Sequence, residues 1–272
     1  MIPELQQAVS DGNVKLAKRL LRDYGSVLTA ADENGDTIMH WAAQLDDARL
    51  CQHVLKRHGQ LATICNKLGY TPVHVALKDN NYCIVKIFLK SKADLAGLAK
   101  AEGLNILQFA AKYCHAHIIR LVLKSLSAKV KEALANEADG LGRTVLHIAA
   151  ATGSRENMLM LLQRTTADLV RRDARGWLPF HHALINGFYF TAEFLAEIAG
   201  LSFESALMFE GCEDVLVVLV TECNNPWVIS MVVHKCPNIA WEIVNGIVDA
   251  YKCTERESKI KGDQITTLDG IK

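Results

Sequence analysis

Residues 35–43 read GDTIMHWAA and residues 69–77 read GYTPVHVAL, so a Gly-x-Thr-x-x-His-x-Ala frame returns after 34 residues. A third copy at 103–111, GLNILQFAA, follows after another 34 residues and carries Asn and Gln in place of Thr and His. The fourth copy, GRTVLHIAA at 142–150, comes after 39 residues, and the fifth, GWLPFHHAL at 176–184, after 34 more. A fixed period indicates that each unit buries its apolar face against its neighbours.

The residues of each copy predict a tight turn followed by two short helices. Gly35 follows turn residues such as Asp32, and glycine accepts the positive φ that a tight turn requires. The threonine then stands where its side-chain oxygen can cap a helix, and Pro72 and Pro179 lie just inside a helix start. Apolar residues at helical spacing follow, as in 82–89, and predict a second helix.

This pattern resembles the ankyrin repeat, whose Thr-Pro-Leu-His-x-Ala motif and period of about 33 residues match the five copies. The resemblance covers about residues 5–200 if the ends are included. It implies an all-α fold, an ankyrin-repeat solenoid with short β-hairpin arms. It also implies a concave face, lined by the first helices and the hairpin tips, at which partners usually bind. The motif is specific for the fold and not for one biological role.

The domain organisation follows from where the motif is present. We predict an ankyrin-repeat domain over 1–200, with an N-terminal cap at 3–30 and motif copies starting near 35, 69, 103, 142 and 176. Helical periodicity continues without the motif over 201–253, which predicts a helical C-terminal cap or a divergent repeat. The last segment, 254–272, is charged and weakly patterned, so we expect a mobile tail.

An insertion separates the third and fourth copies. The five extra residues must lie within 125–138, SLSAKVKEALANEA, which is rich in Lys, Glu and Ala. We predict that they lengthen the second helix or the loop after it, because loop closure costs little per added residue. A role of this segment in recognition is the alternative.

Composition argues against several classes of partner. Lys and Arg number 30, as do Asp and Glu, so the formal net charge is zero and no global field draws the protein to nucleic acid. The longest apolar stretches, 215–220 and 227–233, fall short of the roughly 20 residues that span a bilayer. The N-terminus has no basic start leading into an apolar stretch, so we predict no secretory signal and a cytoplasmic location.

The cysteines, histidines and glycines do not predict a metal site, a cofactor site or a catalytic site. Eight cysteines are scattered without a CxxC pair, which favours reduced thiols over disulfides or zinc. Neither a GxxxxGKS/T nor a GxGxxG segment occurs, and we predict no cofactor. The motif histidines are predicted to hold each turn to its helix. A Cys/His-dependent hydrolase in the C-terminal helices stays an alternative, because that region contains Cys212, Cys223, His234, Cys236 and Cys253.

Three columns of the repeat are predicted to face a partner: the position before the threonine, the position after the histidine and the position after the alanine pair. Folding does not require apolar residues at these places, so large or charged side chains there are candidate anchors. The aromatic members could instead pack against the neighbouring repeat. The predicted partner-binding residues are Asp36, Trp41, Gln44, Tyr70, Val75, Lys78, Leu104, Phe109, Lys112, Arg143, Ile148, Trp177 and His182.

From these columns we predict a protein-interaction scaffold or adaptor that binds another protein, with no catalytic and no metal-binding residues. Aromatic anchors would supply the binding energy, and a charged rim would set orientation. A second alternative is a small anionic ligand held by Lys78, Lys112 and Arg143 on the same face.

Overall fold

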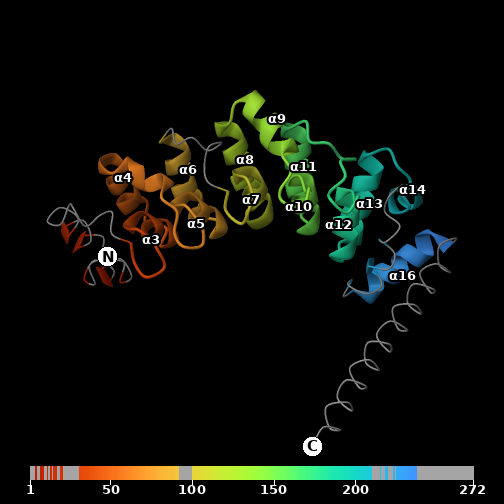
Figure 1. The fold of residues 1–272 in the computed structure, drawn as a ribbon, viewed down its shortest axis with the longest axis horizontal. Helices are drawn as coiled ribbons and strands as arrows, with labels where there is room; N and C mark the ends of the chain where they lie inside the picture. The colour runs from red at the N-terminus through yellow and green to blue at the C-terminus, as the bar shows by residue number, and fades with distance from the viewer. Residues whose placement is uncertain are drawn as a thin grey trace, which may run out of the picture. The chain divides into compact units, whose positions relative to one another are not determined.

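The computed structural model describes residues 31–91, 100–209 and 225–237, with separate positions at 4, 7, 8, 11, 13, 15, 16, 19, 20, 215, 218, 219 and 223. The regular elements in these residues are all helices (Figure 1). The chain divides into two compact units, Met1–Ala149 with Ser154–Asp168 and Ala150–Gly153 with Leu169–Lys272. The predicted all-α repeat fold is confirmed.

In the first unit every motif copy forms a short helix that is followed by a second, usually longer one. The motif helices begin directly after the Thr or Asn of the motif, as predicted. The helices of this unit are α3 (Ile38–Gln44), α4 (Ala48–Arg57), the 3₁₀ helix η2 (Gly59–Thr63), α5 (Pro72–Lys78), α6 (Tyr82–Lys90), α7 (Ile106–Tyr113), α8 (Ala116–Ser125), α9 (Ala128–Asn136) and α11 (Arg155–Arg164).

The second unit continues the same pattern. The fourth motif helix, α10 (Val145–Ala151), begins in the first unit, and its last residues belong to the second. The helices of the second unit are α12 (Pro179–Ile185), α13 (Tyr189–Ile198), α14 (Phe203–Leu207) and α16 (Pro226–Lys235). The helices α14 and α16 lie within the region predicted to be a helical extension.

The arms are tight turns. In the first copy the backbone N–H of Asp32 donates to the carbonyl of Asp36 at 3.0 Å, and the Asp32 carboxylate accepts from the N–H groups of Asn34 and Asp36. Gly35 has φ +80°, and its counterparts in the other copies have φ between +73° and +84°. Within the described residues these arms contain no strand, and the one bridge found there joins Ala101 to Leu104.

Each motif histidine links its turn to the helix that follows, as predicted. The backbone N–H of Thr37 donates to Nδ1 of His40 at 3.1 Å, and Nε2 of His40 lies 2.9 Å from the carbonyl oxygen of Tyr70 in the next copy. All four motif histidines are buried. Burial lowers the pKa of His40, and it lowers the pKa of His74 and His181 to about 4, so these rings are neutral at neutral pH.

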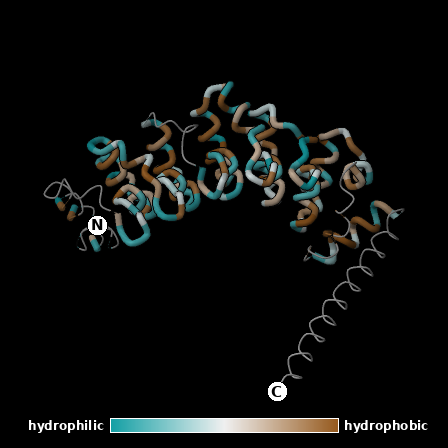
Figure 2. The backbone as a smooth tube through the Cα atoms, viewed as in Figure 1, coloured by the Kyte–Doolittle hydropathy of each residue, from teal (hydrophilic) through white to brown (hydrophobic). Residues whose placement is uncertain are grey.

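The core runs between the helices of each unit. The alanine pair Ala42 and Ala43 is fully buried and allows α3 and α5 to pack closely. Along the chain, hydrophobic segments concentrate in the helices and the arms are hydrophilic (Figure 2). Because neighbouring motif helices pack against each other, the apolar residues of one copy are buried against the next copy.

The insertion was predicted to lengthen a second helix or a loop, and this is wrong. It forms a separate helix, α9, which begins after the cap residue Ser127 and packs against α7. Ser127 interrupts the preceding helix because its extended backbone and its hydroxyl, which accepts from the N–H of Val130, start a new one. Most of the predicted N-terminal cap at 3–30 lies outside the described residues, and so does all of the predicted tail at 254–272.

Candidate partner-binding groove

A cavity of about 200 Å³ lies in the first unit, where the helices α3 and α5 and their arms meet. Five of the predicted partner-binding residues line it, two from the first copy and three from the second. Its walls also include residues that sequence analysis did not select. The lining residues are Asp36, His40, Gln44, Asn66, Leu68, Tyr70, Val75, Lys78 and Asp79.

The cavity follows the length of the two helices, which run in the same direction. At their N-terminal ends, His40 lies 2.9 Å from the carbonyl oxygen of Tyr70. At their C-terminal ends, the side-chain amide of Asn81 donates to the carbonyl of Ala43 at 2.7 Å. These two contacts fix α5 beside α3, so that Asp36 stands at one end of the groove and Asp79 at the other.

The groove has an apolar middle and polar ends. Val75 is half-buried between the ends, and Leu68 at the tip of the second arm is 71% exposed. Asp36 accepts a hydrogen bond from the Asn66 side chain at 2.8 Å. Burial raises the pKa of the Asp79 carboxyl, while the nearby Lys78 opposes this shift. This combination offers a partner both apolar contact and carboxylate acceptors.

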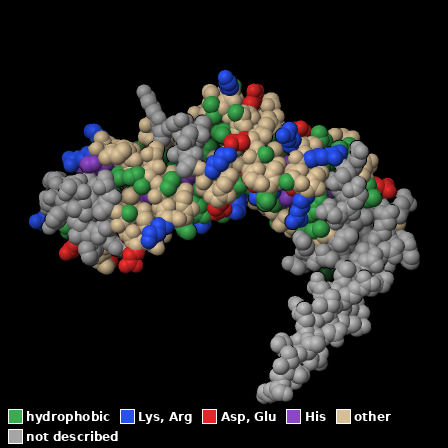
Figure 3. Space-filling view, viewed as in Figure 1, with side chains coloured by type: hydrophobic (Ala, Val, Ile, Leu, Met, Phe, Trp, Pro, Cys, Tyr) green, Lys and Arg blue, Asp and Glu red, His purple; other side chains and the backbone are tan. Residues whose placement is uncertain are grey.

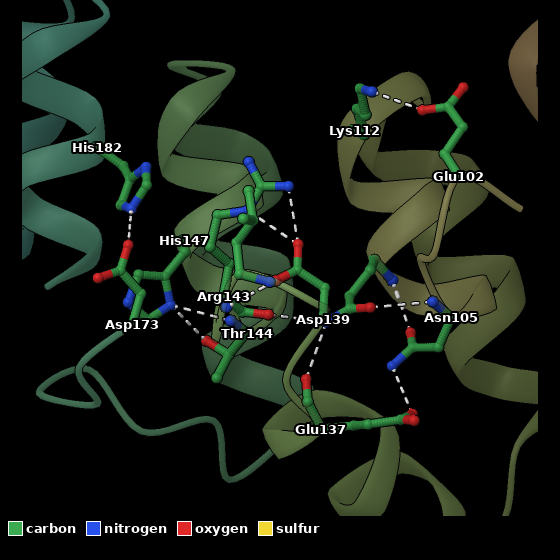
Figure 4. Close-up of polar contacts among 12 residues, drawn as sticks. Glu102, Asn105, Lys112, Glu137, Asp139, Arg143, Thr144, His147, Asp173 and His182 are labelled. Atoms are coloured by element: carbon green, nitrogen blue, oxygen red, sulfur yellow. Dashed lines mark hydrogen bonds and ion pairs between the residues drawn. The ribbon is translucent and has the colours of Figure 1, made fainter. Parts of the chain in front are cut away.

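Beside the groove, an aromatic and charged cluster joins the second and third copies, and we call it the Glu102 cluster. The carboxylate of Glu102 accepts hydrogen bonds from the hydroxyls of Tyr70 and Tyr113. It also forms an ion pair with Lys112 at 2.6 Å (Figure 4). The ammonium of Lys78 lies 5.1 Å from the centre of the Tyr70 ring and 5.8 Å from that of Tyr113. The cluster therefore fixes the wall of the groove.

The titration of Glu102 reflects these contacts. Burial alone raises its pKa, but the hydrogen bonds from Lys112, Tyr70 and Tyr113 outweigh burial and lower the pKa to about 2. The same contacts raise the pKa of Tyr70 and of Lys112, so the charged carboxylate and ammonium and the neutral phenols are the stable forms.

Besides Tyr70, which lines the groove, four predicted anchors are buried and do not present their side chains to a partner in this conformation. Phe109 is fully buried, and Tyr70, His74 and Tyr113 surround it with ring centres 4.8–5.7 Å away. The prediction that these four side chains contact a partner is therefore wrong, because they lie in the core; Tyr70 and His74 of the preceding copy and Tyr113 of its own copy cover Phe109. The four residues are Leu104, Phe109, Ile148 and Trp177.

Other predicted residues are already engaged. The indole N–H of Trp41 donates to the Asp32 carboxylate at 3.1 Å and so holds the first arm. Arg143 forms an ion pair with Asp139 at 2.8 Å, and in the second unit His182 lies 2.8 Å from Asp173 (Figure 4). Because Glu102 and Asp139 neutralise Lys112 and Arg143, the geometry does not favour the alternative of a small anionic ligand.

The third copy, with Asn and Gln in place of Thr and His, is adapted to the inserted helix. Oε1 of Gln108 accepts from the N–H of Asn105, as a histidine Nδ1 does elsewhere, and Nε2 donates to the carbonyls of Glu137 and Arg143. The amide of Asn105 donates to the carbonyl of Leu134 in α9 at 3.0 Å and to the Glu137 carboxylate (Figure 4). The departure from the motif thus supplies additional donors for α9.

Sequence analysis missed Leu68, Asn66, Asp79 and Glu102. The arm tips carry a signal that was not used: the residue before the turn glycine is exposed, and it is Leu in the second and fourth copies. Leu68 and Leu141 are 71% and 59% exposed, which is unusual for leucine in a short turn. No comparable signal marks Asp79, which follows a helix end like many other aspartates.

The described residues contain no group of three or more His, Cys, Asp and Glu side chains poised for a metal. Burial raises the pKa of the thiols of Cys51 and Cys114 to about 12, so neither is a reactive thiolate. Cys223 and Cys236, from the predicted hydrolase region, are buried, while Cys212 and Cys253 lie outside the described residues. No helix in the described part of the chain is both long and apolar enough to cross a membrane.

On the face shown in Figure 3, Lys and Arg side chains alternate with Asp and Glu among exposed hydrophobic groups. This distribution agrees with the formal net charge of zero. On this face, charge therefore acts locally and not through a one-signed surface.

Comparisons with known proteins agree with the fold. A family model described as ankyrin repeats (3 copies) matches residues 5–96, 44–132, 81–173 and 124–205. A similar solved chain belongs to the structure of the predatory endopeptidase Bd0816 from Bdellovibrio bacteriovorus in complex with the immunity protein Bd3460. That alignment has a TM-score of 0.61 and 24% identity and covers 72% of this chain and 97% of the other. A comparison with curated protein sequences finds no match.

Proposed function

Because the chain belongs to the ankyrin-repeat family, we propose that it is a scaffold or adaptor that binds a partner protein in the groove between α3 and α5. The observation that carries this proposal is the cavity of about 200 Å³, which brings together Asp36, Gln44, Tyr70, Val75 and Lys78 from two copies. A groove formed by neighbouring helices is a typical place for peptide recognition.

The groove is built to keep its shape. The Tyr70 hydroxyl is held by Glu102, Trp41 is held by Asp32, and Asn81 ties the far ends of α3 and α5 together. Binding to a wall that is already ordered avoids much of the side-chain entropy lost on association. The exposed residues Leu68 and Gln44 are left to make contact, and Leu68 can bury apolar area against a partner.

The proposal can be tested by blocking the groove without disturbing its walls. Val75→Arg places a long charged side chain at the half-buried centre of the groove. The matched control is Cys83→Arg, which puts the same side chain on the exposed surface of α6 in the same repeat. Trp41 and Tyr70 are poorer choices, because each holds an arm in place.

Full-length wild type and both variants would be used for affinity capture from a cell lysate, followed by mass spectrometry. We expect a protein that is recovered with wild type and with Cys83→Arg and is lost with Val75→Arg. Circular dichroism should show the same helical signal for all three proteins. Equal recovery by Val75→Arg would contradict the groove as the binding site.

A further inference from the structure

The groove has an unusual balance of charge. Among the described residues, the Asp79 carboxylate has no hydrogen-bond donor and no ion-pair partner, and Asp36 receives one hydrogen bond, from Asn66 through Oδ1. Lys78 is the cation in the lining, but its ammonium lies over the rings of Tyr70 and Tyr113. Two carboxylates at opposite ends are therefore left with free acceptor oxygens.

The spacing of these carboxylates sets a length. Asp36 precedes α3 and Asp79 follows α5, so at least the length of α5 separates the two ends; its seven residues, at a rise of 1.5 Å each, span about 10 Å. An extended polypeptide advances about 3.3 Å per residue, so at least about three residue steps separate side chains at the two ends. Between the ends, Val75 and Leu68 present aliphatic surface, which a small apolar side chain can cover.

From this geometry we infer that the groove binds an extended segment of the partner that carries a basic side chain at each end, at least three residues apart, with small apolar residues between. The inference rests on the proposed function and specifies its partner. One basic side chain pairs with Asp36, and the other pairs with Asp79. Gln44 lies at the Asp79 end, its side-chain amide makes no hydrogen bond to the described residues, and it can bond to the peptide backbone.

Charge complementarity favours this occupant over an acidic one. An acidic segment would have Lys78 as its one cation in the groove lining and would face both Asp36 and Asp79 at close range. Moreover, Lys78 would have to leave the two tyrosine rings, which it stacks upon, to pair with that segment. A basic segment requires no such rearrangement, since both carboxylates already have open oxygens.

The test uses three labelled hexapeptides with the full-length protein: Gly-Arg-Val-Ala-Arg-Gly and the same peptide with both Arg replaced by Gln or by Glu. Binding is measured by fluorescence anisotropy at low ionic strength. We expect the Arg peptide to bind at least about fivefold more tightly than the Gln peptide, the size expected of one partly exposed ion pair. Added salt should remove most of the difference.

Two substitutions on neighbouring residues should have opposite effects. Asp79→Asn should weaken binding of the Arg peptide by about threefold to fivefold, and Lys78→Gln should strengthen it by about twofold, because it removes a like charge. The inference is overturned if Lys78→Gln weakens the Arg peptide, if the Glu peptide binds most tightly, or if none of the three binds. None of these results affects the capture experiment, in which the contrast between Val75→Arg and Cys83→Arg tests the groove itself.

Discussion

The junction between the first and second copies and the junction between the third and fourth copies use the same frame with different side chains. At the first, Nε2 of His40 bonds to the carbonyl of Tyr70; at the second, Nε2 of Gln108 bonds to the carbonyl of Arg143, the equivalent residue. These two junctions therefore use an acceptor and a donor at fixed positions, which either an imidazole or an amide supplies. The amides of the third copy add donors, and these hold α9.

The two junctions also differ in what their central side chains do. The position after the motif histidine or glutamine is Val75 in the second copy and Phe109 in the third. Val75 is half-buried and lines the groove, while Phe109 is fully buried under Tyr70 and Tyr113. One column thus lines the proposed binding groove in one copy and packs in the core in another, and the following predictions separate the two positions.

The largest effect is expected at Phe109. Phe109→Ala removes a fully buried ring that Tyr70, His74 and Tyr113 contact, and it leaves a cavity. We expect a loss of about 3–5 kcal/mol in the free energy of unfolding, measured by urea denaturation. Val75→Ala in the same column should cost about 1 kcal/mol, because its side chain is smaller and half-buried. Equal losses would show that both residues belong to the core.

The next largest loss of stability is expected at Gln108, which takes the place of the motif histidine in the third copy. Gln108→Leu leaves the N–H of Asn105 and the carbonyls of Glu137 and Arg143 without their partner and should cost about 2–3 kcal/mol. Gln108→His restores the acceptor and one donor and should cost less than half as much. If the two variants lose equal stability in urea denaturation, the equivalence of Gln108 and the motif histidines is wrong.

A third prediction concerns the pH dependence of stability, since the motif histidines can be protonated and Gln108 in the third copy cannot. Burial lowers the folded-state pKa of His74 to about 4, whereas an unfolded histidine titrates near 6.5. The unfolded state binds the extra proton between these values, so the stability from neutral His74 is complete above about pH 6.5 and is lost as pH falls toward 4.

The measured quantity is the free energy of unfolding between pH 7 and pH 5, which should fall by about 2 kcal/mol for each such histidine. His74→Gln should flatten this dependence by about that amount and keep the bond from the Thr71 N–H. An unchanged slope would mean that His74 is not neutral in the folded protein. Among the described residues Nε2 of His74 has no hydrogen-bond partner, and the imidazole packs edge-on to the Phe109 ring, so an amide loses no hydrogen bond there.

Much of this fold follows from the sequence because the same turn, helix-start and histidine signals occur in the repeated copies. The turn glycines, the helix starts and the buried histidines agree with the motif, since each depends on residues within a few positions. The roles of Phe109 and Trp177 could not be derived in this way. The burial of Phe109 depends on the rings that the preceding copy places against it, and the pattern within one copy contains no such information.

The groove was predicted only in part for a related reason. Gln44 in α3 and Val75 and Lys78 in α5 occupy positions that the repeat fixes, so their approach to one another could be derived. Asp79 and Leu68 come from a helix end and an arm tip, whose directions depend on hydrogen bonds to neighbouring copies. The contacts of α9 with the third copy were missed because its Asn105 and Gln108 were interpreted as a degenerate form of the motif.

The smallest effect is expected at the arm tips, where Glu102 and Leu68 occupy equivalent positions in neighbouring copies. Glu102 has φ +56°, a left-handed conformation that disfavours residues with a Cβ, whereas Leu68 has no positive φ. Removing the Glu102 side chain breaks the bonds to Tyr70, Tyr113 and Lys112 in both Glu102→Ala and Glu102→Gly. Only the glycine variant relieves the backbone, so it should be more stable than the alanine variant by about 1 kcal/mol.

At Leu68 the order should reverse, and Leu68→Ala should be more stable than Leu68→Gly by about 0.5–1 kcal/mol, because glycine loses more backbone entropy on folding. Urea denaturation of the four variants measures both differences. If alanine is the better residue at both tips, the left-handed turn at Glu102 is wrong. If the order reverses as expected, the carboxylate contacts of Glu102 offset a backbone cost that the second copy avoids, and the Glu102 cluster is then a specific feature of the third copy.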